Sequence, residues 1–118
     1  MRTRYASQAP FETKDGSEIR ELMHPSVHGS RNQSLAEARL PPGQTTALHR
    51  HRKSEELYHV TSGRGLVTLG GEQFAIEPGD TVLIPPRTPH CVHNPGPEAL
   101  VFLCCCSPAY AHEDTELL

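Results

Sequence analysis

Three histidines and one glutamate have types and spacing that suit a metal site. His49 and His51 lie two residues apart, so both imidazoles point to the same side of an extended strand. Glu56 follows at the start of the next apolar run, and His90 begins a later run after a proline-rich turn. Three imidazoles and one carboxylate form a mixed nitrogen and oxygen donor set for one divalent first-row metal, and this set does not choose among Mn, Fe, Co, Ni and Zn.

Such a site predicts metal-assisted chemistry. In an octahedral ion, four protein ligands leave two positions for waters, dioxygen or a chelating substrate. A bound metal polarises a carbonyl group or lowers the pKa of a bound water. Tyr58 shares a strand face with Glu56, so we expect it to point inward. It would act there as a hydrogen-bond donor or an acid–base group, or would pack as a lining aromatic.

The elements that position these residues are short strands separated by Gly and Pro turns, a pattern typical of an all-β sandwich or barrel. We expect a hairpin within 13–22 and strands over 34–40, 46–51, 56–61, 65–69, 72–76, 81–84, 90–93 and 100–106. The whole chain, 1–118, is interpreted as one domain. Its parts are an N-terminal arm with strands (1–33, of which 1–12 are extended), a barrel core (34–106) and a C-terminal tail (107–118), whose acidic end forms at most one helical turn.

Composition and charge exclude several classes of protein. The 118 residues suffice for one modest core, and 20 Gly and Pro residues disfavour a helical bundle. The net charge of −3 predicts no general attraction to nucleic acid or to an anionic membrane. No apolar run approaches the roughly 20 residues of a membrane helix, and the first residues do not form a secretory signal. Three of the four cysteines are consecutive, which favours a reducing cytoplasm over a disulfide framework.

Two segments of the chain resemble the two motifs of the cupins. The first motif is matched by Gly43, His49, His51, Glu56 and Gly63. The second is matched by Gly79, Pro85, His90 and Asn94. One position departs, since Arg87 stands where a glycine is usual, which places the local turn geometry in question. The motifs are separated by the 15 residues 64–78, and the resemblance covers roughly 34–110.

The resemblance implies a single cupin β-barrel, a jelly roll of two facing sheets. It implies that one divalent transition metal is bound inside the barrel by His49, His51, Glu56 and His90. It also implies a homodimer, formed through edge strands with the N-terminal residues as an exchanged strand.

The activities of cupins include dioxygenation, decarboxylation, isomerisation and lyase chemistry, and fold and ligands alone do not select among them. We expect a metal-dependent enzyme, an oxidoreductase, lyase or isomerase, acting on a small oxygen-rich molecule. The alternatives are a small-molecule or sugar-binding module without turnover, and a structural or regulatory cupin with a protein partner. An acid or base inside the barrel, besides the metal ligands, would favour the enzyme.

Other reactive side chains have simpler interpretations. In the cysteine run 104–106 the first and third thiols share one strand face, and their apolar neighbours favour a packing role over soft-metal binding. His59 and His93 are expected on outer faces, and Asn94 in a turn or in support of the ligands. Arg87 is the best candidate to recognise a substrate carboxylate or phosphate. The remaining histidines, expected in solvated loops, are His24, His28 and His112.

Overall fold

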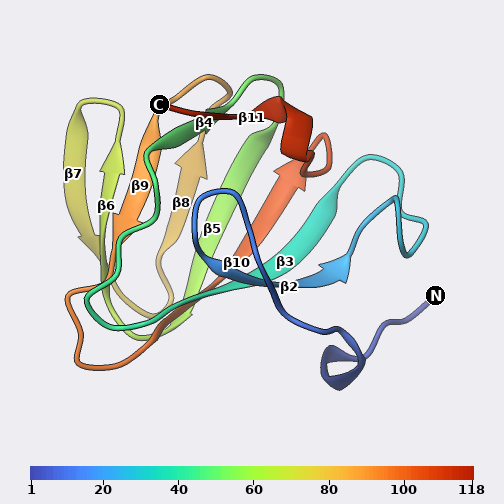
Figure 1. Cartoon of the computed structure of the whole chain (residues 1–118), viewed down its shortest axis with the longest axis horizontal. Helices are drawn as coiled ribbons and strands as arrows, with labels where there is room; N and C mark the ends of the chain where they lie inside the picture. Colours follow the sequence, from blue (N-terminus) through green and yellow to red (C-terminus); the bar gives the residue numbers. More distant parts are fainter.

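The computed structural model describes all 118 residues and consists of two antiparallel sheets that face each other (Figure 1). The larger sheet has the strand order β1-β2-β3-β10-β5-β8, and the smaller one the order β11-β4-β9-β6-β7. This architecture is the all-β jelly roll that the sequence predicts. No helix in the chain has the length and the apolar character that crossing a membrane requires.

The strands are β1 (Phe11–Glu12), β2 (Glu18–Met23), β3 (Ser34–Leu40), β4 (His49–His51), β5 (Glu55–Ser62), β6 (Gly65–Leu69), β7 (Glu72–Ile76), β8 (Thr81–Ile84), β9 (His90–His93), β10 (Leu100–Ser107) and β11 (Thr115–Leu117). Two single 3₁₀ turns complete the elements, η1 (Tyr5–Ser7) and η2 (His112–Asp114). Strands β3, β6, β7, β8 and β9 have the bounds expected from the sequence. Strand β4 is shorter than expected, because Ala47 N–H donates to the carbonyl of Asp15 in a distant loop and leaves the sheet ladder.

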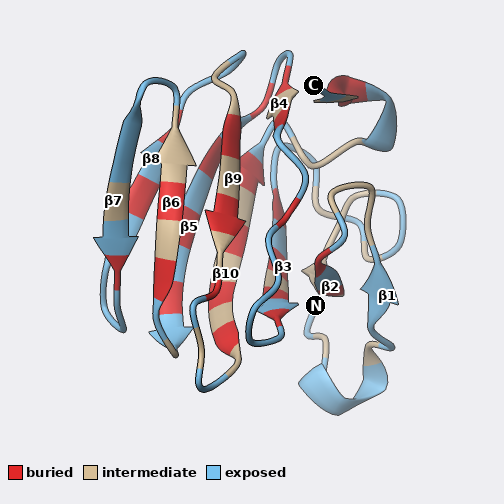
Figure 2. Cartoon of the chain, turned by 60° about the vertical axis from the view of Figure 1, so that its left-hand side comes forward, coloured by how far each residue is buried: buried red, intermediate tan, exposed pale blue.

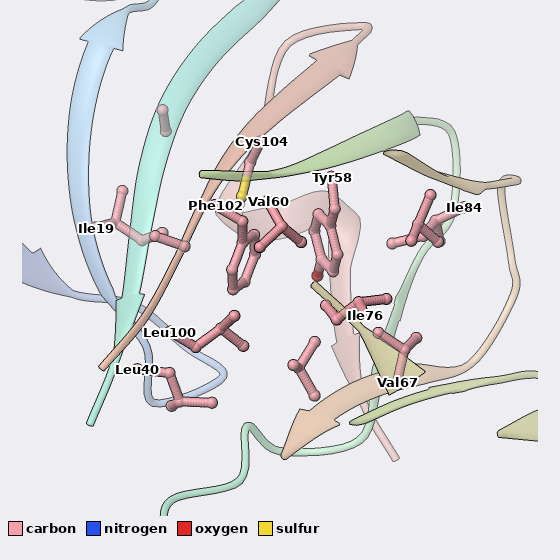
Figure 3. Packing of buried hydrophobic residues seen from close by; sticks show 14 residues of the cluster. Ile19, Leu40, Tyr58, Val60, Val67, Ile76, Ile84, Leu100, Phe102 and Cys104 are labelled. Atoms are coloured by element: carbon pink, nitrogen blue, oxygen red, sulfur yellow. The ribbon is translucent and has the colours of Figure 1, made fainter. Parts of the chain in front are cut away.

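Alternation along the strands decides which side chains enter the barrel. In β5 and β8, buried residues alternate with exposed ones, and β10 alternates between buried and half-buried residues (Figure 2). The inward side chains build one core, in which the rings of Tyr58 and Phe102 pack with their centroids 4.6 Å apart (Figure 3). Because the ligand strands follow the same alternation, His49, His51 and Glu56 face the interior with this core.

The N-terminal segment folds back onto the barrel. Strands β1 and β2 form the expected hairpin, whose turn spans 13–17. The expected extended arm over residues 1–12 contains the single turn η1 as well as the strand β1. The Arg20 guanidinium lies 4.2 Å from the centre of the Tyr5 ring, and this contact fastens η1 to β2. At the hairpin turn, Lys14 Nζ donates to the carbonyl of Thr115 over 2.8 Å. The hairpin therefore connects the N-terminus to the C-terminal strand.

The C-terminal residues also differ from expectation. The acidic segment contains the single turn η2, but it continues into β11, which pairs antiparallel with β4 so that Thr115 lies opposite His51. Asp114 is buried, and its carboxylate accepts hydrogen bonds from the backbone N–H groups of Lys53 and Ser54. The supposed tail is therefore a structural edge of the smaller sheet.

Two glycines with similar backbone angles provide a test of this packing. Gly63 and Gly43 have φ of +79° and +81°, and a Cβ at Gly63 would lie 2.2 Å from the carbonyl oxygen of Ala99, whereas a Cβ at Gly43 would meet nothing within 4 Å. We expect Gly43→Ala to cost about 1–2 kcal/mol of unfolding free energy from backbone strain alone, and Gly63→Ala clearly more. Urea denaturation of both variants measures the difference. Equal losses would contradict the close approach at Gly63.

Candidate metal centre

The three predicted histidines meet inside the barrel. His49 and His51 come from β4, and His90 begins the adjacent β9, where it lies directly opposite His49 in the sheet register. All three are buried, and one ring nitrogen from each lies within 4.8 Å of the others. The imidazoles of His49 and His90 have centroids 4.2 Å apart. These histidines are positioned to hold one metal ion.

Hydrogen bonds fix the protonation of each ring. His49 Nδ1 lies 2.7 Å from the carbonyl of Ala47, and His90 Nδ1 lies 2.9 Å from the carbonyl of Thr88. A carbonyl only accepts, so in a neutral ring the proton resides on Nδ1 and the lone pair on Nε2. The lone pair of each of these two rings is therefore directed to the shared centre.

The third ring has the same tautomer for a less direct reason. His51 Nδ1 lies 3.0 Å from the hydroxyl oxygen of Thr115. That hydroxyl donates its own proton to the carbonyl of Ala111 over 3.1 Å, so toward His51 it acts as an acceptor. Since Thr115 belongs to β11, the C-terminal strand sets the orientation of a ring that lies in the first motif. Such outer hydrogen bonds are the usual way in which proteins orient metal-binding histidines.

Glu56 adds a carboxylate to the three rings. Its Oε1 atom lies 3.2 Å from His51 Nε2 and 3.5 Å from His90 Nε2. Neither contact has the alignment of a hydrogen bond, and Glu56 Oε1 and His90 Nε2 are both buried without a hydrogen-bond partner. Lone pairs that face each other in a buried site require a cation between them. The donor set therefore fits a divalent metal.

Protons on the histidine rings can supply the positive charge between these groups in place of a metal ion. The pKa values of the histidines and of Glu56 reflect this. Burial lowers the pKa of His49, and the neighbouring His90 lowers it further. Burial acts to lower the pKa of His51 as well, but the Glu56 carboxylate outweighs burial and raises it. Burial would raise the pKa of Glu56, yet His51 and His90 bring it down to about 2. The carboxylate therefore stays charged at any ordinary pH.

The cysteine run divides between two environments. Cys104 joins the hydrophobic core, as the sequence predicts, and Cys105 lies on the outer face of β10. Cys106 is different, because its Sγ donates to Glu56 Oε2 over 3.2 Å. Burial raises the pKa of the Cys106 thiol, and the Glu56 charge raises it further. Cys106 is therefore a neutral thiol that donates a hydrogen bond to Oε2 of Glu56, the carboxylate oxygen that does not face the histidines.

A cavity opens on this centre. The space around it, counted together with the open solvent at its mouth, is about 560 Å³. His49, His51, Glu56 and Tyr58 line it, as does Asp15 from the hairpin turn. Burial raises the pKa of Tyr58 well above 10, so this phenol keeps its proton and serves as a donor rather than a base.

Asp15 and Glu21 are lining residues that the sequence did not reveal. Asp15 Oδ2 lies 3.7 Å from His49 Nε2, although the two residues are far apart in the chain. Glu21 projects from β2, its Oε1 is buried without a partner, and burial raises its pKa. Neither residue belongs to a recognisable motif. The Asp-Gly turn was visible only as a turn signal, and nothing in the sequence showed that it faces the barrel.

The other singled-out residues lie away from the metal position. Asn94 is fully buried and supports a turn, since its side-chain amide donates to the carbonyls of Leu40 and Glu98. His59 and His93 lie on outer faces and contact Thr81 and Thr45, respectively. The loop histidines His24 and His28 are not simply solvated, because each makes hydrogen bonds and is half-buried, whereas His112 is exposed.

Arg87 does not face the cavity. It is exposed and is absent from the cavity lining, so its expected contact with a substrate anion finds no support in its position. Its φ of +64° keeps the left-handed geometry that the usual glycine would adopt. Its backbone N–H donates to the carbonyl of His51 over 2.6 Å, which ties the proline-rich loop to the ligand strand. The motif therefore keeps its geometry despite the substitution.

The fold and the site define a jelly-roll protein with a histidine-rich centre inside its barrel. A model of the cupin domain matches residues 36–106, and the chain belongs to the cupin family. It is 52% identical to an uncharacterised protein of Methanocaldococcus jannaschii, over 100% of this chain and 94% of that one. It is 28% identical to an oxalate-binding protein of Thermotoga maritima, over 73% of this chain and 71% of that one. The crystal structure of a predicted oxalate decarboxylase from Thermotoga maritima superposes with a TM-score of 0.80 at 24% identity, covering 92% of this chain and 99% of that one.

The directions of these pKa values predict that metal affinity decreases as the pH is lowered. The metal requires neutral rings, and the raised pKa of His51 means that its proton competes above the ordinary value of 6.5. Calorimetric titration of the full chain with Zn²⁺ should give at least about tenfold weaker binding at pH 5.5 than at pH 7.5. Circular dichroism at both values controls for unfolding. An affinity independent of pH over this interval would contradict the assignment of the rings as ligands.

Proposed function

We propose that this protein is a metal-dependent enzyme acting on a small oxygen-rich molecule bound in the barrel cavity. One observation carries the proposal: three buried imidazole rings each have a nitrogen within 4.8 Å of the others, and a carboxylate oxygen lies 3.2 and 3.5 Å from two of them. His49, His51, His90 and Glu56 would hold a divalent transition metal there. When bound, such an ion polarises a coordinated oxygen or lowers the pKa of a bound water. Oxygenase, decarboxylase, isomerase and lyase reactions all draw on this chemistry.

The chain's own residues supply the remaining functions of an active site. The apolar wall around Phe102 and Ile19 excludes water from the inner part of the cavity. Tyr58 offers a phenol that remains protonated, which suits donation to a substrate oxygen. Asp15 presents a carboxylate oxygen to the same space, where it can accept a proton or hold a hydroxyl group.

These acid and base groups favour an enzyme over a binding module. A module that only binds needs no proton-accepting group beside the metal, whereas the cavity contains Asp15 and Glu21 besides the ligand glutamate. Both possibilities occur in the names of similar proteins, one called oxalate-binding and the other a predicted oxalate decarboxylase. For this chain we propose turnover.

The metal content of variants tests the proposed ligands. Purified wild-type protein should contain about one transition metal per chain, and His51→Ala and His90→Ala should each lose it while remaining folded, because a site with three donors left binds far more weakly. His59→Ala is the matched control, since His59 lies on the exposed face of β5. Elemental analysis by mass spectrometry measures the content. A wild-type chain that takes up no metal even after reconstitution would refute the proposal.

We also propose that the protein forms a homodimer. Strand β1 pairs with β2 of its own chain, so the support comes from a sheet face and not from an exchanged strand. On the outer face of the larger sheet, cross-strand neighbours form one apolar row, consisting of Leu35, Cys105, Leu57 and Leu83. The leucines of this row are 37%, 39% and 52% exposed. An apolar row across four strands is suited to pack against its own copy.

Light scattering coupled to size exclusion tests the dimer. The wild-type chain should have twice the 13.0 kDa mass of one chain, and Leu57→Glu should yield monomers because a charge enters the middle of the row. Val27→Glu is the control, since Val27 is 71% exposed in the loop between β2 and β3 and is not part of the row. A wild-type mass of one chain would contradict the proposal.

The cytoplasm is the compartment we propose. All four cysteines are unpaired, and Cys91 and Cys105 are half-buried rather than fully protected. Exposed thiols persist where the surroundings are reducing.

A further inference from the structure

Among acidic and strongly basic side chains, only acidic ones line the cavity over the candidate metal centre. Its wall includes three carboxyl groups, those of Asp15, Glu21 and Glu56, and contains no lysine or arginine. Proteins recognise small carboxylates and phosphates chiefly through arginine and lysine. Because it contains no lysine or arginine, the cavity wall differs from that of a typical anion-binding site.

Three cationic side chains, those of Lys14, Arg50 and Arg52, interact with other groups of the protein. Lys14 directs its Nζ to the backbone carbonyl of Thr115. Arg50 and Arg52 both lie beside the Glu116 carboxylate on β11, at 3.3 and 3.6 Å. None of the three is part of the cavity wall, so no side chain is in position to neutralise an incoming anion.

The carboxyl groups instead provide unused acceptors. Oδ1 of Asp15 accepts from the hydroxyls of Thr13 and Ser17 and from the backbone N–H of Ser17, at 2.7, 2.7 and 2.9 Å. These bonds fix the carboxylate and leave Oδ2 without a hydrogen bond, 3.7 Å from His49 Nε2. Oε1 of Glu21 is buried and also has no hydrogen-bond partner. Oδ2 of Asp15 and Oε1 of Glu21 can thus each accept a hydrogen bond from a hydroxyl group of a ligand.

We propose that the cavity takes an uncharged molecule with two adjacent hydroxyl groups, which donate to Asp15 and Glu21 while their oxygens reach the metal, and that it excludes small organic dianions. This inference rests on the proposed function, since it requires the metal. A neutral diol can donate to the carboxyl oxygens, whereas a dianion such as oxalate brings only further acceptors.

Charge balance leads to the same preference. The two positive charges of a divalent ion are already balanced by the Glu56 and Asp15 carboxylates. A bound dianion would leave two uncompensated negative charges in a largely buried space, which is strongly unfavourable. A neutral diol adds no further negative charge to the site.

Two probes of similar shape test the proposal. Catechol and oxalate both present two adjacent oxygens to one ion. Free in solution at pH 7, catechol is neutral and brings two hydroxyl protons for the carboxyl acceptors, whereas oxalate carries two negative charges and brings no proton. The full chain is loaded anaerobically with Co²⁺, and the visible absorption of the ion and calorimetry report the binding of each probe. We expect catechol to bind at least about tenfold more tightly than oxalate, and Asp15→Asn, which keeps the Oδ1 acceptor, to raise oxalate affinity at least about tenfold.

Controls separate the outcomes. Asp80→Asn, which alters an exposed turn carboxylate away from the cavity, should change neither affinity. Should Asp15→Asn fail to fold, Glu21→Gln serves in its place, with weaker catechol binding expected. Wild-type protein that binds oxalate as tightly as catechol would overturn the inference, as would an oxalate affinity unaffected by these substitutions. A chain that binds no Co²⁺ would refute the proposed function itself, whereas a Co²⁺-loaded chain that prefers oxalate would refute only this inference.

Discussion

The structure depends on one electrostatic constraint, the meeting of three buried imidazole rings beside one buried carboxylate. Two of the rings are oriented by carbonyls located two residues earlier in the chain, those of Ala47 and Thr88. The third ring is oriented by a hydroxyl that has already donated its proton. Three neutral imidazoles and one carboxylate repel each other unless a cation lies between them. These buried groups are therefore arranged so that they could hold a cation between them.

Both ends of the chain complete this centre from outside the two motifs. The N-terminal hairpin brings Asp15 to the cavity wall, and the C-terminal strand brings Thr115 to the His51 ring. The two ends are linked directly by Lys14, which donates to the Thr115 carbonyl. The motifs supply the candidate ligand side chains, whereas the ends orient the His51 ring and place Asp15 on the cavity wall.

Much of the barrel could be predicted because its cues are local. Gly and Pro turns and the alternation of apolar residues defined five strands to the residue, and the spacing of His49 and His51 put both rings on one face. The missed features depend on long-range contacts. Strand β11 is three residues of an acidic segment and exists only because β4 pairs with it. Asp15 is part of an ordinary turn in the sequence, and its role depends on where the hairpin docks. The apolar neighbours of Cys106 in the sequence predict a core residue. Only its register opposite Glu56 brings the thiol to the carboxylate.

The most direct test of the account is a long-range ¹H–¹⁵N correlation spectrum of the histidine rings in the ¹⁵N-labelled chain, recorded before and after addition of one equivalent of Zn²⁺. The account predicts that His49, His51 and His90 each carry the proton on Nδ1 in the loaded protein, and that Zn²⁺ shifts the Nε2 resonance of these three rings and of no other histidine. Rings protonated on Nε2, or a spectrum unchanged by Zn²⁺, would contradict it.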